Sequence, residues 1–194
     1  MIPAAWLGVL TLVACQGRER PQDTAEAPAI ADTSLAPAAD TGVRLSDANI
    51  VALLDEANAA DSTAGALARG KATSPEVKQF ARLMMSEHHA LRTQGQQLAK
   101  QLGVTPQPPA NDPVKAAADR EMAALQAAKG QQFDRTYIDQ EVAIHQAVLD
   151  LAEQAHGQTE NEQLKALIEK AKPVIQKHLD QAKEIQGKLG KPAA

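Results

Sequence analysis

Residues 74–103 read SPEVKQFARLMMSEHHALRTQGQQLAKQLG, and they carry the start, the apolar face and the end of one long helix. Ser74 suits the position that accepts hydrogen bonds from the first free backbone N–H groups, and Pro75 suits the first helical position, where no N–H is needed. Gly103 is typical of the left-handed residue that ends a helix. Between these ends, one face repeats at helical spacing through Val77, Phe80, Ala81, Met84, His88, Leu91, Leu98 and Leu102. The segment therefore predicts an amphipathic helix with one histidine on its buried face.

The same periodicity extends from this helix in both directions along the chain. We expect a helix over 46–70, capped by its serine, with Leu45 and Ile50 forming a hydrophobic staple across the cap. We expect another over 131–156, which Gly157 ends. Alternating patterns of β-branched or aromatic residues are missing, so no strand is predicted.

The last long helix is predicted over 159–189. Thr159 and Glu162 have the spacing of a capping box at its start. Pro173 lies inside this helix, where it lacks the N–H that would bond to an earlier carbonyl. We therefore expect a kink, with a carbonyl freed near Glu169.

A proline-rich link over 105–113 is followed by a short helix over 114–129, which Gly130 ends. Four long amphipathic helices joined mostly by short links predict an all-α fold, an antiparallel four-helix bundle with this short extra helix between its second and third members. Residues 45–189 are enough for one domain with a substantial core. A helical solenoid is the alternative, but no repeat recurs at a fixed period.

The first residues predict export. Residues 1–14 are apolar and too few to span a bilayer, and they end in Leu12-Val13-Ala14-Cys15, the pattern of a lipoprotein signal peptide. Cys15 would then be acylated and anchor the chain to the envelope membrane on the periplasmic side, and Gln16 favours the outer membrane. No Lys or Arg precedes Cys15, so we expect the true start upstream. The alternative is an uncleaved apolar tail with an accidental cysteine.

Composition limits what the chain does. Residues 15–44 are rich in Ala and Pro with almost no large apolar side chain, which predicts a disordered tether. A net charge of −4 and an aromatic content of 2% argue against nucleic-acid binding, which needs clustered basic and stacking side chains. Cys15 is the one cysteine, so a lipidated chain has no thiol for disulfides, metal binding or catalysis.

Each long helix places one ionisable group on its apolar face, at a similar depth along the bundle: Asp61, His88, His145 and His178. Three imidazoles and a carboxylate are a reasonable ligand set for zinc, copper or iron. Glu141 lies one turn before His145 and can orient it, and Tyr137 lies one turn earlier still. The sequence thus predicts a metal site in the bundle core, with Tyr137 and Glu141 as supporting residues.

Other polar residues have simpler interpretations. His89 points away from the apolar face. His156 lies near the C-terminus of its helix, where a positive charge interacts favourably with the helix dipole. Acid pairs such as Asp119 and Glu121 are expected on solvated surfaces. No phosphate-binding loop, paired-histidine metalloprotease helix or serine-nucleophile motif is present in the sequence.

Three motifs resemble those of a bacterial family called domain of unknown function 4142. They are residues 74–81 with the Met84–His88 segment, residues 133–139 with His145, and Pro173 with His178-Leu179 and Ala182-Lys183. The resemblance covers roughly 45–189. It implies a ferritin-like four-helix bundle, often exported or envelope-anchored, with no established activity.

The resemblance also implies which residues correspond to the family's site. His88, His145 and His178 occupy its histidine positions, and Asp61 stands where the family usually has glutamate. Di-iron ferritin-like proteins carry a Glu-x-x-His pair on each of two helices. Here Met85 and Ile175 stand at that spacing before His88 and His178, which argues against a ferroxidase or oxygenase.

Three hypotheses follow. The first is an envelope-anchored lipoprotein that binds or buffers a metal. The second is a structural or stress-related envelope interaction module whose buried histidines only satisfy one another, as hydrogen-bonded polar groups can. The third, an oxidoreductase with a bound metal, is the least favoured, so the chain is more simply not an enzyme.

Overall fold

The computed structural model describes residues 44–190, and this part of the chain is all-α, without strands. Its five helices are α1 (Asp47–Lys71), α2 (Pro75–Leu102), α3 (Pro113–Ala127), α4 (Gly130–Gln158) and α5 (Glu162–Leu189). The signal peptide, the lipidated Cys15 and nearly all of the tether predicted from the sequence lie outside the described residues. None of the described helices combines the length and the apolar content needed to cross a bilayer.

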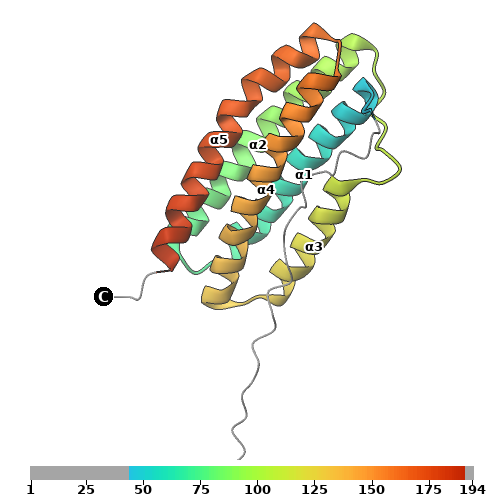
Figure 1. Cartoon of the computed structure of the whole chain (residues 1–194). Coiled ribbons are helices and arrows are strands. Elements are labelled where there is room, and N and C mark those ends of the chain that lie inside the picture. The colour runs from blue at the N-terminus through green and yellow to red at the C-terminus, as the bar shows by residue number, and fades with distance from the viewer. Residues whose placement is uncertain (1–43, 191–194) are drawn as a thin grey trace, which may run out of the picture. The chain divides into compact units, whose positions relative to one another are not determined.

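The four long helices lie alongside one another, and the shorter α3 lies beside them (Figure 1). α1 packs along α2, and α4 packs along α5. Contacts of α2 with α5 and of α1 with α4 complete the arrangement, so each long helix borders two others. α3 contacts α1 and α4 and therefore covers the seam between them.

The helix ends predicted for the first half of the chain are confirmed. Ser46 caps α1, and its side chain and that of Asn49 bond to each other's backbone N–H groups. Leu45 packs against the apolar cluster that contains Ile50, as expected for the staple. Gly103 ends α2 with a φ of 65°, the left-handed conformation that glycine adopts without strain.

The helix ends in the second half differ from the prediction. Thr159 does not cap α5, because the residue directly before that helix is Asn161, whose side-chain oxygen accepts from two backbone N–H groups of its first turn. Thr159 instead donates to Asp47 at the start of α1. Gly157 does not end α4 either. The helical hydrogen bonding continues past it, because the N–H of Thr159 donates to the carbonyl of Ala155.

The short connection before α4 also differs. α3 ends at Ala127 rather than at Lys129, and Gly130 is the first residue of α4, with a φ of 56°. α5 continues as one helix through Pro173. The kink proposed there stays a prediction.

The core has two apolar clusters with a polar layer between them. One cluster includes Phe80, Met84, Phe133 and Tyr137, and the other includes Ile50, Val51, Ala152, Leu164 and Ile168. Along each long helix, the residues of the polar layer come between residues of the two clusters. Because α1 and α5 pass through the clusters in the opposite order to α2 and α4, neighbouring long helices run in opposite directions.

The close contact of α1 with α2 depends on Gly65. A Cβ at this position would lie 2.9 Å from the Ala81 carbonyl oxygen and 3.2 Å from Cγ of Met85. We expect Gly65→Ala to lower the free energy of unfolding by about 1–3 kcal/mol, because overpacking outweighs the gain in helix propensity.

Gly95 is the matched control for this substitution. It also lies within a long helix, but a Cβ there meets nothing within 4 Å. Gly95→Ala should raise stability by roughly 0.5–1 kcal/mol. Urea unfolding followed by circular dichroism measures both variants, and equal stabilisation by the two would contradict a close contact at Gly65.

Candidate metal centre

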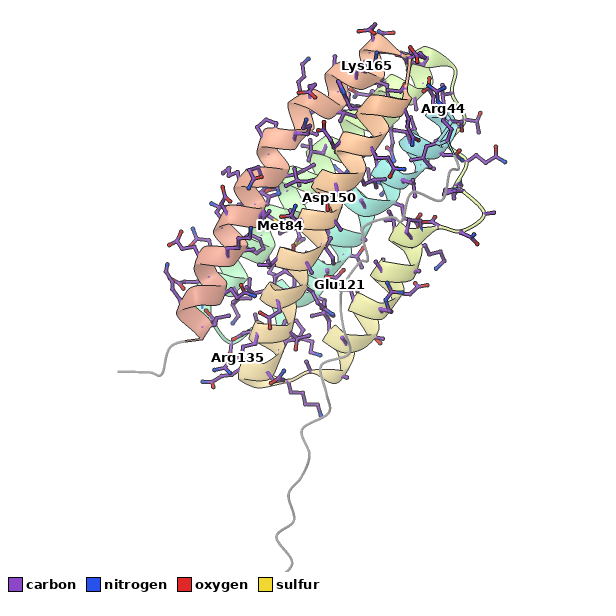
Figure 2. All side chains as sticks on the ribbon, in the orientation of Figure 1. Arg44, Met84, Glu121, Arg135, Asp150 and Lys165 are labelled. Carbon is purple, nitrogen blue, oxygen red and sulfur yellow. The ribbon has the colours of Figure 1, made fainter. Side chains whose placement is uncertain are left out.

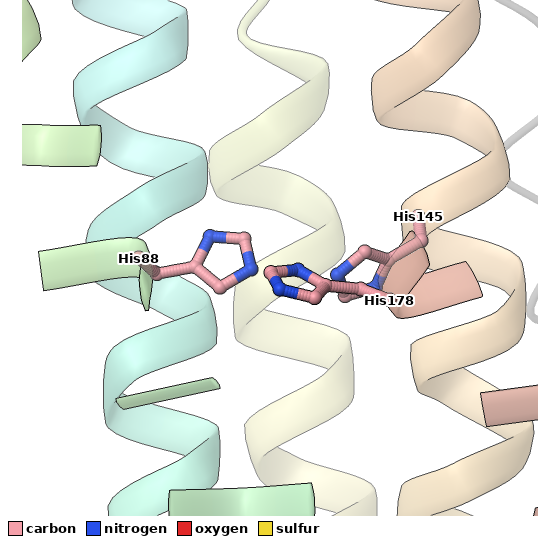
Figure 3. Close-up of side chains that lie close together, drawn as sticks. All are labelled: His88, His145 and His178. Atoms are coloured by element: carbon pink, nitrogen blue, oxygen red, sulfur yellow. The ribbon is translucent and has the colours of Figure 1, made fainter. Parts of the chain in front are cut away.

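Three histidine rings from three helices meet in the polar layer (Figure 3). His88 comes from α2, His145 from α4 and His178 from α5. Their ring centroids lie 5.1 Å apart for His88 and His178, 5.3 Å for His145 and His178, and 5.4 Å for His88 and His145. One ring nitrogen of each lies within 4.8 Å of those of the other two. The structure therefore brings these three histidines together, and their role as metal ligands stays a prediction.

Two of the rings are fixed by oxygen atoms on their outer side. His88 Nδ1 lies 2.9 Å from Oδ1 of Asn58 and 3.3 Å from Oδ2 of Asp61. His178 Nε2 lies 2.7 Å from Oε2 of Glu87. Because these partners are acceptors, the ring nitrogen facing them donates, and a neutral ring then carries its lone pair on the other nitrogen.

His145 is fixed from its own helix. Its Nδ1 donates to the backbone oxygen of Glu141 at 2.9 Å and lies 3.2 Å from the carboxylate of the same residue. Glu141 therefore contacts the ring of His145, and its role as a supporting residue of a metal site stays a prediction. Tyr137, the other predicted supporting residue, is fully buried in the apolar cluster that contains Phe80 and Phe133. Its hydroxyl has no hydrogen-bond partner among the described residues.

The remaining nitrogen of each ring is buried without a partner. These atoms are Nε2 of His88, Nε2 of His145 and Nδ1 of His178, and none is hydrogen bonded within the described part of the chain. Buried polar atoms are normally paired, so three orphaned nitrogens in one place are unusual. A metal held about 2.0 Å from three imidazoles keeps their nitrogens about 3.5 Å apart. In the structure these nitrogens lie no more than 4.8 Å apart, so the rings would have to move closer together to hold one ion.

The rings differ in their affinity for protons. Burial, with the nearby His145, lowers the pKa of His88 to about 4. Burial is also the main cause that lowers the pKa of His178 to about 4. Burial acts on His145 in the same direction, but the hydrogen bond with Glu141 and the charges of Asp61 and Glu141 outweigh it and raise its pKa to about 9. At neutral pH two rings are therefore neutral and His145 holds a proton that a metal must displace.

Asp61, the fourth predicted ligand, is buried at the same level but approaches from a different side. It contacts Nδ1 of His88, the nitrogen that also bonds to Asn58, rather than the unpartnered Nε2. It also belongs to a second group, with Glu141 and His145, whose ligand atoms lie within 4.8 Å of one another. Its role as a ligand beside the three histidines stays a prediction.

Sequence reasoning missed three residues around the site. Asn58 lies three residues before Asp61 on the same helix face, which is a signal that periodicity offers. Glu121 was expected on a solvated surface, but it is 3% exposed because α3 turns it toward α1 and α4, on the same face as the buried Leu125 (Figure 2). Glu87 on α2 contacts His178 on the neighbouring helix α5, and no pattern within α2 indicates this.

Two histidines outside the site lie as predicted. His89 is exposed, although it follows His88 directly. His156 lies in the last turn of α4, and its Nε2 is 3.5 Å from the Glu169 carboxylate. Neither belongs to a group of potential metal ligands within the described residues.

A family model described as Domain of unknown function (DUF4142) matches residues 32–185. Among solved structures, the chain is similar to one described as CopM in the Cu(I)-bound form, with a TM-score of 0.62 and 19% sequence identity. The similarity covers 76% of this chain and 100% of that one. At this identity it shows a common fold only. No curated protein matches the chain.

Proposed function

This chain belongs to the DUF4142 family, and within that family we propose that it is an envelope-anchored helical protein that binds one copper(I) ion between His88, His145 and His178. One observation carries the proposal. Three imidazole nitrogens with no hydrogen-bond partner lie together in a buried layer. Each is held there by an oxygen on the far side of its ring, the arrangement that orients histidine ligands in metal sites.

Charge favours copper(I) over divalent ions. At neutral pH the metal-free site holds the proton of His145, so a monovalent copper ion replaces one positive charge with another. A divalent ion would add a charge to a layer buried between two apolar clusters, which costs desolvation energy.

Coordination number favours copper(I) as well. Zinc in proteins normally takes a fourth ligand, often a water molecule. A small cavity of about 40 Å³ adjoins His88, but neither His145 nor His178 lines it, so it does not open onto the point where the rings meet. The CopM structure of similar fold is described as Cu(I)-bound, which supports the same choice of ion.

We further infer that the four long helices form an antiparallel, ferritin-like four-helix bundle, with α3 as an added helix over one seam. The order of packing around the core and the opposite directions of neighbouring helices support this architecture. We also propose that Cys15 is acylated and that the following segment tethers the domain to the outer membrane in the periplasm. The signal sequence and the Ala/Pro-rich composition support the anchor.

The structural-module alternative fits the site less well. It requires each buried histidine to be satisfied by hydrogen bonds, yet one nitrogen of each ring has no partner within residues 44–190. It also expects that replacing His178 with leucine leaves stability unchanged or raised, and that metal has no effect on unfolding.

Copper(I) titration of the full chain tests the proposal. Protein stripped with a chelator is titrated without oxygen against a competing chromogenic chelator, and one equivalent of copper(I) per chain is expected. At 100 times the dissociation constant the ion should stabilise the fold by roughly 2.7 kcal/mol. For a domain of this size, that raises the melting temperature by about 5–10 °C. A chain that retains no copper(I) and melts at an unchanged temperature would be a structural module instead.

A further inference from the structure

An apolar cleft lies between α1, α3 and α4, and none of the three histidines lines it. Its volume is about 530 Å³, and most of its lining side chains are alanine, valine, leucine or isoleucine. The larger ones are Val114 on α3 and Ile144, Val148 and Leu151 on α4. These four are only half-buried and belong to neither apolar cluster formed by the described residues. Residues 44–190 therefore leave an apolar surface open at this seam.

The cleft exists because only the C-terminal half of α3 is fixed to the bundle. Leu125 is fully buried in the apolar cluster that includes Phe133, and Nζ of Lys71 donates to its carbonyl at 2.8 Å. The residues of α3 that line the cleft begin at Pro113 and end at Glu121, in the other half of the helix. The cleft therefore separates the first turns of α3 from α4.

The described part of the chain begins at one end of this cleft. Nη2 of Arg44 donates to the backbone oxygen of Gln158 at 3.2 Å, and the N–H of Leu45 donates to the side-chain oxygen of the same residue at 2.7 Å. Gln158 itself lines the cleft. The chain thus enters the domain beside the cleft, so a preceding apolar segment needs no long linker to reach it.

Residues 35–43, which read LAPAADTGV, are long enough to span the cleft. Along α4 the cleft extends from Ile144 to Gln158, about 21 Å at 1.5 Å per residue. An extended chain covers about 3.3 Å per residue, so about six or seven residues span that length. The nine residues before Arg44 therefore reach from one end of the cleft to the other.

The side chains of this segment also suit the cleft. Eight of the nine are uncharged, and alanine and proline are small enough for a narrow groove between helices. Side chains alternate between two sides of an extended chain, which puts Asp40, the one charged residue, on the opposite side from Leu35 and Val43. One side of the segment can therefore face apolar atoms while the carboxylate faces water.

From the open apolar lining, the entry point and this reach, we infer that residues 35–43 dock along the cleft and cover it. The family match begins at residue 32 rather than at the first helix, so it includes this segment and leaves out 1–31. A segment attached at the mouth of the cleft has an effective concentration of about a millimolar, which favours it over a separate partner of similar chemistry. The disordered tether predicted from the sequence then ends at residue 34.

Paramagnetic relaxation in the full chain tests this inference without any metal. Cys15→Ser removes the one native thiol, and Asp40→Cys carries a nitroxide label on the side of the segment that faces water. Amide signals of cleft residues such as Ala117 and Ala147 should be lost on labelling and return when the nitroxide is reduced. Amides of α2 and α5, which do not line the cleft, should keep their signals.

Two adjacent alanines of α3 offer a matched pair of variants. Ala117 is half-buried and lines the cleft, whereas Ala116 is exposed and does not. Ala117→Arg should push the segment out and restore the cleft signals, while Ala116→Arg should leave them lost. Circular dichroism checks that both variants fold, and Ala147→Arg on the opposite wall replaces Ala117→Arg if the latter does not.

A mixed sample identifies the occupant. Isotope-labelled chains without nitroxide are mixed with nitroxide-labelled chains that carry no isotope, and the cleft signals should then persist. Their loss in this sample would place a second copy in the cleft and overturn the inference. Weak broadening spread over the whole domain, or an effect that Ala117→Arg does not reverse, would show that residues 35–43 do not cover the cleft. Each of these outcomes leaves the copper(I) proposal unaffected, because that is measured separately.

Discussion

Replacing His88 with alanine is expected to weaken copper(I) binding about 100-fold, whereas replacing the next residue, His89, leaves it unchanged. Structural metal sites with four ligands bind with about 10–16 kcal/mol, which is roughly 3 kcal/mol per ligand, or about 100-fold in affinity. His88 supplies one of three orphaned nitrogens, and His89 is exposed on the outer face of the same helix.

The pair is a controlled comparison because both substitutions remove the same side chain from adjacent positions of α2. Competition titration at pH 7 gives the two affinities, and His145→Ala and His178→Ala should resemble His88→Ala. Equal affinities for the His88 and His89 variants would mean that copper binds outside the three rings. Urea unfolding of the metal-free variants shows whether the loss of affinity comes from the loss of the fold.

Copper(I) affinity should rise about 100-fold between pH 6 and pH 8. The pKa of His145 is raised to about 9, while those of His88 and His178 are lowered to about 4. Between these values one ring nitrogen must lose a proton for each ion bound, which changes affinity about 10-fold per pH unit. Binding therefore weakens as the pH falls from 9, and the dependence disappears above that value.

Calorimetry in two buffers of different ionisation enthalpy measures the proton directly. At pH 7 about one proton should be released per copper(I) bound. Glu141→Gln removes the carboxylate that helps to raise the pKa of His145, so the variant should release less than one proton and show a flatter pH profile. An affinity that is constant from pH 6 to pH 8 would mean that all three rings are already neutral.

Features set by neighbours in the sequence were predictable. Ser74 and Gly103 mark the ends of α2 through bonds within its own first and last turns, so the sequence alone locates both. The end of α4 was misjudged because Thr159 bonds to Asp47, more than a hundred residues away, while Asn161 caps the next helix. Which of several good capping residues is used depends on how the chain packs, and no local pattern contains that information.

In the candidate site too, local sequence predicts some features and the packing of distant segments decides others. Helical spacing places His88, His145 and His178 inside, and counting along each helix from its cap brings them to one level. Which nitrogen of each ring is free depends on oxygens from other segments, such as Glu87 for His178. Glu121 was missed because a short helix becomes buried only where a seam between longer helices is available to it.

The placement of the histidines has a mechanical consequence. α2 and α4 stand opposite each other, and each packs along α5 rather than along its opposite partner. An ion held by all three rings would join this diagonal as well as the adjacent pairs. A bound ion would then restrict the sliding of these helices past one another. The rigidity of the domain would therefore depend on how much metal is available to it.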